Sequence, residues 1–170
     1  MLQVIRSSKR VFVLSENSPR VTWVERMFDR LSEEDKDLMS SIDYSDTLSR
    51  FPGVSPTVFE SLRGVHSTRN RLRNWEILVE VMESDWSPYD WYMVFEYHND
   101  LDIRSGIQEV IDRVGVSLSG VLESIVDPVD RRFCRVTVHD GGVELKRQGV
   151  RFRGDYWWYF RCPRVIPWSD

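Results

Sequence analysis

The chain has 170 residues, of which 41% are hydrophobic and 29% are charged, and its net charge is −4. This balance is typical of a globular protein and excludes a largely disordered chain. Apolar runs are too short to cross a bilayer, and the polar first residues do not match a secretory signal. Two cysteines far apart in sequence do not form a disulfide framework. We therefore expect a cytoplasmic protein without a membrane span.

Charge is distributed unevenly and divides the chain into three segments. Residues 1–21 carry a net charge of +3, residues 22–113 carry −9, and residues 114–170 carry +2. The acidic segment has helical patterning, whereas the flanking segments have mostly strand patterning. We therefore predict an N-terminal β segment over 1–21, an acidic helical bundle over 22–113, and an extra helix with an antiparallel β-meander over 114–170.

The N-terminal segment contains two short apolar runs, Leu2–Ile5 and Val11–Leu14. A polar stretch that contains two serines separates them. This pattern predicts an N-terminal β-hairpin, and because a lone hairpin is marginally stable, the hairpin is expected to join the C-terminal strands.

Serines mark three helix starts in the acidic segment. Ser32 precedes three acidic residues, while Ser55 and Ser87 each precede a proline, which suits an N-cap followed by the first helical position. Apolar residues spaced i, i+3, i+4 indicate one buried face per helix, and they place Trp75 and Trp91 in the core. The expected helices span 21–31, 34–49, 56–63, 68–83, 88–98 and 101–113.

The C-terminal segment is predicted to begin with a helix over 117–126 that ends before Pro128. Alternating apolar residues and glycine-containing turns then indicate β-hairpins. The expected strands are Phe133–His139, Val143–Arg147, Val150–Arg153 and Tyr156–Arg161.

The sequence does not predict an enzyme. It contains no glycine-rich phosphate loop, no nucleotide-binding fingerprint and no clustered metal-ligand spacing. Cys134, His139 and Asp140 lie close together, but on a regular strand the thiol and the imidazole would point to opposite faces. We therefore predict a non-enzymatic protein with no catalytic residue, cofactor or metal.

Two groups of residues are candidate binding surfaces. A basic cluster lies inside the acidic segment, and opposite charges on one module suit head-to-tail electrostatic association. In the C-terminal tail, arginines flank aromatic residues, a pattern that can hold single-stranded nucleic acid, although such a strand more often packs into a core. The protein-binding candidates are Arg63, Arg69, Arg71, Arg73, Glu33, Glu34, Asp35 and Asp37. The nucleic-acid-binding candidates are Arg151, Arg153, Trp157, Tyr159 and Arg161.

Several segments of the acidic region together resemble a known family. They are Leu48–Pro52 at a helix end, the short helix from Ser55 to Arg63, Ser67–Asn70 at the start of a long apolar helix, Trp86 at the next junction, Trp91–Phe95 and Leu101–Ile103. On these segments, residues 22–113 resemble a caspase recruitment domain of the kind in cytosolic RNA-sensor helicases and their mitochondrial adaptor. The resemblance implies a six-helix death-fold bundle.

The resemblance also implies a function. Such a domain binds another death-fold protein, so we expect an adaptor or decoy in innate-immune or cell-death signalling, with homo-oligomers as a further expectation. A small carrier suits a modulator or a pathogen-encoded mimic in host–virus interaction. Two alternatives stay open: a nucleic-acid-binding regulatory protein that uses the C-terminal tail, and a structural or host-interaction protein unrelated to the death fold.

Overall fold

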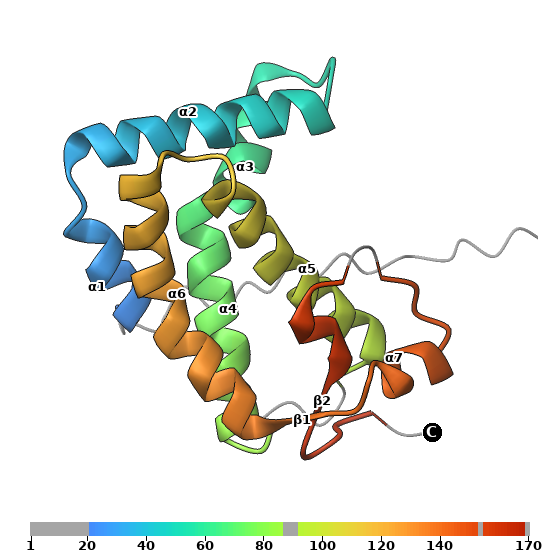
Figure 1. Cartoon of the computed structure of the whole chain (residues 1–170). Coiled ribbons are helices and arrows are strands. Elements are labelled where there is room, and N and C mark those ends of the chain that lie inside the picture. Colours follow the sequence, from blue (N-terminus) through green and yellow to red (C-terminus); the bar gives the residue numbers. More distant parts are fainter. Residues whose placement is uncertain (1–20, 87–91, 153–154, 169–170) are drawn as a thin grey trace, which may run out of the picture.

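The computed structural model describes residues 21–86, 92–152 and 155–168 (Figure 1). This part is mostly helical with one small antiparallel sheet, which agrees with the predicted α+β class. The predicted N-terminal hairpin and Trp91 lie outside the described residues. In chain order the elements are α1 (Trp23–Asp29), α2 (Glu33–Arg50), α3 (Pro56–Val65), α4 (Thr68–Glu83), α5 (Val94–Ile111), α6 (Val116–Val136), β1 (Thr137–His139), α7 (Val143–Arg147), the 3-10 helix η1 (Trp157–Phe160) and β2 (Arg161–Pro163).

The first four helices lie close to their predicted bounds, and a short polar side chain caps the start of each. The Ser32 hydroxyl accepts a hydrogen bond from the amide of Asp35, and Ser55 and Ser67 act in the same way at the starts of α3 and α4. At α1, Thr22 and Glu25 form a reciprocal capping box. These caps satisfy amides that have no partner inside the helix.

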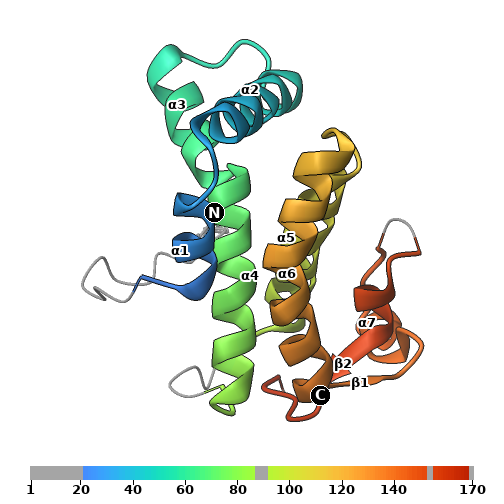
Figure 2. The ribbon, with the colours of Figure 1, turned by 60° about the vertical axis from the view of Figure 1, so that its left-hand side comes forward.

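Helices α4, α5 and α6 lie side by side and form the body of the molecule (Figures 1 and 2). Helix α1 packs against α4 and α6, while the segment from β1 to β2 covers part of α5. Helices α2 and α3 lie at one end of the body, and Figure 2 shows them extending beyond it. We call residues 33–65, which form α2 and α3, the arm.

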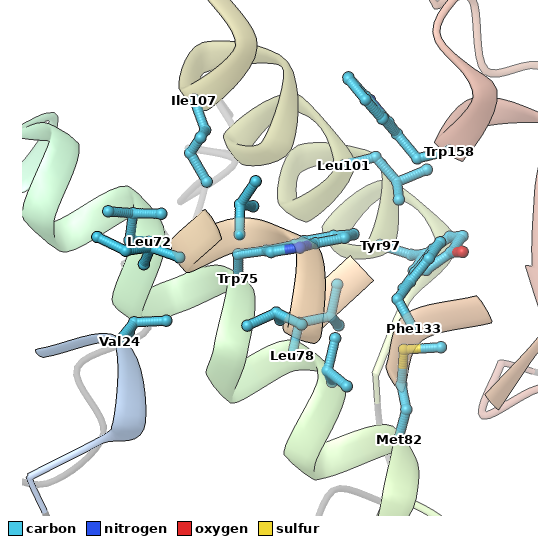
Figure 3. Close-up of a cluster of buried hydrophobic side chains, with 14 of the residues drawn as sticks. Val24, Leu72, Trp75, Leu78, Met82, Tyr97, Leu101, Ile107, Phe133 and Trp158 are labelled. Carbon is cyan, nitrogen blue, oxygen red and sulfur yellow. The ribbon is translucent and has the colours of Figure 1, made fainter. Parts of the chain in front are cut away.

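One hydrophobic core joins these parts (Figure 3). Trp75 lies in it at 1% exposure, as predicted, and contacts Phe133 of α6 with a ring separation of 4.7 Å. The core begins at Val24 in α1 and reaches Trp158 and Tyr159 near the C-terminus. The core is therefore continuous across residue 113, where the distribution of charge along the sequence indicated the end of the helical bundle.

A single helix, α5, replaces the two helices predicted over 88–98 and 101–113. The predicted break falls at Asn99 and Asp100, which are helical in the structure. Tyr97, Leu101 and Arg104 are buried at helical spacing on both sides of this point. Burial of that face outweighs the low helix propensity of the two residues. Residues 22–113 therefore hold five helices in their described part, where the sequence predicted six.

Helix α6 also departs from the prediction, because it continues through Pro128 to Val136. Proline removes one amide donor, but Ile125, Val129 and Phe133 on either side of it are buried in the hydrophobic core. The strand expected over 133–139 is therefore reduced to β1.

The predicted β-meander is wrong in the described residues, where the sheet consists of β1 and β2 paired antiparallel. Residues 143–147 form α7, because both Asp140 carboxylate oxygens accept backbone amides at its start, from Gly142 and Glu144. Gly142 has a φ of 74°, which suits glycine. No strand forms over the described residues 150–152, and η1 occupies most of the range predicted as the last strand.

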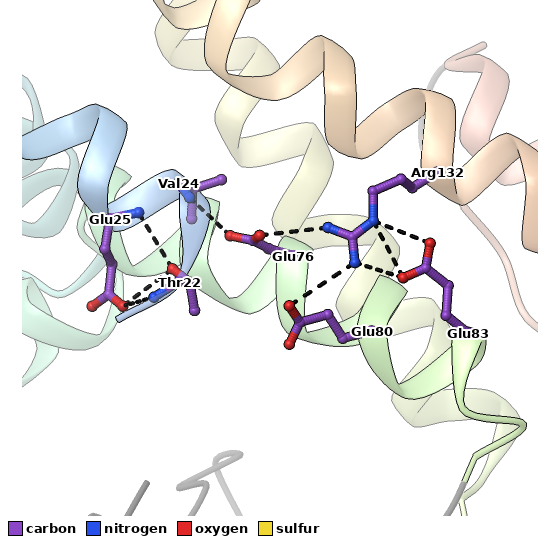
Figure 4. A network of polar contacts seen from close by, with 7 residues as sticks. All are labelled: Thr22, Val24, Glu25, Glu76, Glu80, Glu83 and Arg132. Atoms are coloured by element: carbon purple, nitrogen blue, oxygen red, sulfur yellow. Dashed lines mark hydrogen bonds and ion pairs between the residues drawn. The ribbon is translucent and has the colours of Figure 1, made fainter. Parts of the chain in front are cut away.

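A charged network joins α1, α4 and α6 (Figure 4). Arg132 of α6 lies 2.6 Å from Glu83, 3.4 Å from Glu76 and 3.9 Å from Glu80. The other oxygen of Glu76 accepts the amide of Val24 at 2.9 Å. One arginine therefore fixes three carboxylates of α4, and one of these holds the start of α1.

Candidate functional site

The arm exposes apolar side chains on both of its helices. Tyr44 and Leu48 of α2 are 48% and 51% exposed, and Val58 of α3 is 47% exposed. No residue of α3 is fully buried, and α2 contributes only Met39 to the buried hydrophobic core. The ring of Tyr44 meets Phe59 edge-on at 5.0 Å, so the two helices hold each other while their outer apolar surface faces solvent.

A hollow of about 270 Å³ lies where the arm meets the end of α1 and the start of α4. Phe28 and Met39 give it an apolar lining. Lys36, Arg63 and Arg69 place three cations around it. A hollow with apolar walls and charged edges can receive an amphipathic side chain or helix from another molecule.

Each of these cations has a carboxylate close by. Lys36 lies 2.7 Å from Glu33, and Arg63 lies 2.7 Å from Glu60. Arg69 lies 3.1 Å from Asp29. The carboxylates are 55–85% exposed, so these ion pairs contribute little to stability and a partner can exchange them for its own charges.

A buried carboxylate fixes the arm to the body beside this hollow. Asp43 of α2 accepts hydrogen bonds from the amide of Thr68 at 3.0 Å and from its hydroxyl at 2.7 Å. Burial raises the pKa of Asp43, and the bonds from Thr68 act in the opposite direction. Asp43 therefore ties α2 to the start of α4.

The structure brings part of the predicted basic cluster to the hollow. Arg63 and Arg69 lie at its edge. Arg71 is inside the protein at 5% exposure, where its guanidinium donates to the carbonyl of Gly106 at 3.2 Å. Arg73 is half-buried and lies 3.8 Å from Glu25. Arg71 joins α4 to α5 and does not face a partner.

The predicted acidic cluster lies at the same end of the molecule. Glu33 pairs with Lys36 at this edge, and Asp35 accepts the Ser32 hydroxyl at 2.7 Å. Glu34 and Asp37 are exposed. Glu33 therefore lies beside the hollow through Lys36, whereas the carboxylates that contact Arg63 and Arg69 are Glu60 and Asp29, outside the predicted acidic cluster.

Sequence reasoning missed the contributions of Lys36, Tyr44, Leu48 and Val58. The pair Tyr44 and Leu48 is spaced i, i+4 like a core face, so sequence patterning alone assigns it to the interior. Only the position of the arm at the end of the body leaves this face uncovered.

The structure uses much of the candidate nucleic-acid surface internally. The Tyr159 hydroxyl hydrogen-bonds to Asp102 and, at 2.8 Å, to Ser105. Arg161 donates to the Thr137 hydroxyl at 2.7 Å. Trp157 is 38% exposed and Arg151 is exposed, while Arg153 lies outside the described residues.

A buried ion pair inside the body supports the chain that follows α6, residues 137–168, which we now call the C-terminal segment. Arg104 of α5 lies 2.9 Å from Asp130 of α6, and Trp75 donates to the same carboxylate at 2.8 Å. The Arg104 guanidinium sits 4.4 Å from the ring centre of Trp158, whose indole donates to Ser105 at 3.1 Å. These groups satisfy one another, so we assign them a structural role.

The described residues contain no group of three or more His, Cys, Asp or Glu side chains that could hold a metal ion. In the same part of the chain, every helix is too short or too polar to cross a membrane. No protein-family model, curated protein or solved structure matches this sequence.

Proposed function

We propose that this chain is a non-enzymatic protein-interaction module that binds its partner through the arm. The observation that carries the proposal is that α3 has no fully buried residue while Tyr44, Leu48 and Val58 of the arm are about half exposed. Exposed apolar side chains with charged groups nearby favour protein binding, because burying them on association releases water from apolar atoms.

Charges beside this surface would give the contact its specificity. Lys36, Arg63 and Arg69 can meet carboxylates of a partner, and Glu34 and Asp37 can meet its cations. Complementary charge of this kind speeds association and rejects wrong partners more than it adds affinity. The apolar side chains would supply most of the affinity.

The resemblance of residues 22–113 to a caspase recruitment domain suggests the class of partner. We therefore propose homotypic binding to another death-fold protein, in the cytoplasm, with a role as adaptor or decoy in innate-immune or cell-death signalling. This part of the proposal rests on the sequence segments that carry the resemblance.

The test is binding of the full chain to purified recruitment domains of RNA-sensor helicases and of their adaptor, measured by calorimetry. The variant Leu48→Ser/Val58→Ser should weaken binding about tenfold or more. Val143→Ser/Ile166→Ser is a matched control, because both residues are exposed but lie outside the arm, at 62% and 45%. Equal binding by the arm variant and the wild type would contradict the proposal.

The same experiment separates the alternative function. If the chain binds none of these domains but binds a single-stranded oligonucleotide, and this binding weakens steeply with salt and is lost in Arg151→Ala/Trp157→Ala, the protein is a nucleic-acid-binding regulator.

A further inference from the structure

The hollow beside the arm is basic, although it lies in the acidic part of the chain. Its charged lining consists of Lys36, Arg63 and Arg69 with the carboxylates of Asp43 and Glu60. Three cations and two carboxylates give the described lining a net charge of +1, whereas residues 22–113 as a whole carry −9. The hollow is therefore a place where this segment can receive negative charge.

The carboxylates near the hollow do not close it to an anionic group. Asp43 is already hydrogen-bonded to the start of α4. Glu33 and Asp29, which contact two of the cations, are not part of the described lining and are 85% and 55% exposed. The three cations are 27–49% exposed, so a carboxylate of another molecule can reach them and replace an exposed partner at little cost.

Apolar groups border the same space as these cations. Phe28 of α1 and Met39 of α2 line the hollow, and the Arg69 guanidinium lies 5.7 Å from the centre of the Phe28 ring. A group that fills the hollow therefore meets an aromatic ring and a cation side by side. This combination suits an apolar side chain that has a carboxylate close to it.

The size of the hollow favours a side chain over a free small molecule. Its volume of about 270 Å³ is below the ~300–1,000 Å³ of pockets that enclose small-molecule ligands. One large side chain seated in a pocket is the usual anchor of a protein interface. Lys36, Ser40 and Arg63 line the hollow from the arm, so such an anchor would lie at the edge of the proposed binding surface.

We propose that the hollow holds one large apolar side chain from an acidic segment of the partner, whose carboxylates contact Lys36, Arg63 and Arg69. This inference rests on the proposed function, because it takes the partner to be a protein that binds at the arm. It adds the chemistry of the partner, which is negative charge next to a bulky apolar residue, and the place where that residue sits.

The test begins with a phage-displayed library of short random peptides, selected on the full chain. The enriched peptides should carry Asp or Glu beside one large apolar residue. A synthetic copy of the strongest binder is then measured by fluorescence anisotropy. Alanine in place of its apolar residue should weaken binding about tenfold or more. Amides in place of its carboxylates should weaken binding several-fold and reduce its dependence on salt.

A glycine in the wall of the hollow allows the site to be blocked. A Cβ added at Gly64 of α3 would meet nothing within 4 Å, so Gly64→Phe places a ring there without a clash. Gly120 of α6 is likewise exposed and helical with nothing within 4 Å, so Gly120→Phe is the matched control. The first variant should bind the peptide about tenfold more weakly, and the second should bind it like the wild type. If Gly64→Phe melts below its control, Ser40→Phe blocks the hollow from a second exposed position.

Neutral variants test the role of the cations. Arg63→Gln/Arg69→Gln removes two positive charges at the hollow and should weaken the peptide several-fold. Arg131→Gln/Arg135→Gln removes two exposed arginines of α6, outside the arm, and should leave binding unchanged. The two double variants change the net charge equally, so a difference between them reports contact at the hollow.

Three results would overturn the inference. They are a selection that enriches no peptide, enriched peptides that lack acidic or large apolar residues, and equal binding by the wild type and the blocked variant. Recruitment domains that bind Gly64→Phe normally but fail to bind Leu48→Ser/Val58→Ser would refute the inference and leave the proposed function in place. Acidic peptides that bind the hollow when no recruitment domain binds would support the inference and refute only the proposed class of partner.

Discussion

The arm and the C-terminal segment both pack on the same three-helix body, but they use their side chains differently. The C-terminal segment buries Trp158 and Tyr159 and hydrogen-bonds both to Ser105 of α5. The arm leaves Tyr44 and Leu48 about half exposed. Apolar residues of similar size therefore stabilise the fold in one region and remain available for contact in the other.

Their charged groups differ in the same way. Arg104, which packs on the ring of Trp158, and its partner Asp130 are 4% and 9% exposed. Lys36 and Arg63 of the arm, and Arg69 beside it, are each paired with an exposed carboxylate. A buried pair is costly to break, whereas exposed pairs exchange freely with those of a partner. We therefore expect substitutions in the two regions to have very different effects on stability.

The largest effect is expected at the buried pair. Arg104→Ala leaves the Asp130 carboxylate buried without its main cation, and should lower the free energy of unfolding by about 3–5 kcal/mol. Urea unfolding measures this. The double variant Arg104→Met/Asp130→Leu removes both charges and should recover part of the loss, although Trp75 then lacks its acceptor. A single variant as stable as the wild type would contradict the structural role of this pair.

The next effect depends on pH. Burial raises the pKa of the Asp100 carboxyl to about 7, against the opposing hydrogen bond from Tyr92. The folded protein therefore holds a proton that the unfolded chain has lost between about pH 4 and 7. Stability should fall as pH rises through this window, by at most about 1.4 kcal/mol per pH unit for one group, and then level off.

The variant Asp100→Asn isolates this contribution, because its amide oxygen can still accept a hydrogen bond from Tyr92 without titrating. Glu96 is the other charged group that acts on Asp100, and it stays in place. As pH rises from 5 to 8, the free energy of unfolding of the variant should increase relative to that of the wild type. A difference that does not change with pH would show that Asp100 titrates normally.

Alanine substitutions at two helical glycines should change the free energy of unfolding by smaller amounts, and in opposite directions. Alanine normally stabilises a helix by about 0.5–1 kcal/mol relative to glycine. At Gly106 the new Cβ would lie 3.1 Å from Nε of buried Arg71, so Gly106→Ala should instead cost about 1 kcal/mol. At Gly120 nothing lies within 4 Å, and Gly120→Ala should stabilise. Thermal melts that show the same sign at both sites would contradict this description of Arg71.

The sequence predicts the elements that local interactions fix, and it fails where contacts with distant residues decide the structure. Helices α1 to α4 were predictable because Thr22, Ser32, Ser55 and Ser67 cap them, and a cap acts within four residues. Local signals were misleading at Pro128, where burial against a distant helix overrides them. Short segments such as 143–147 have too few residues to separate helical from strand periodicity.

The site was predictable in part for a related reason. The sequence shows that Arg63, Arg69 and Arg71 are basic and close together, but Arg71 points inward because Gly106 of α5, 35 positions later, leaves room for its guanidinium. That room exists only once α4 and α5 have packed together. The neighbouring arrangement of acidic and basic groups likewise depends on how α1, α2 and α4 meet.

The smallest effect on stability is expected in the arm. Leu48→Ser and Val58→Ser remove apolar atoms that already face water, so each should change the free energy of unfolding by no more than about 0.5 kcal/mol. Leu72→Ser is the comparison, because Leu72 is 1% exposed and its replacement should cost several times more. Urea unfolding of the three single variants at low protein concentration measures the difference without a contribution from association. A large loss at Leu48 or Val58 would mean that these residues serve the fold, and the contrast between the arm and the C-terminal segment would then disappear.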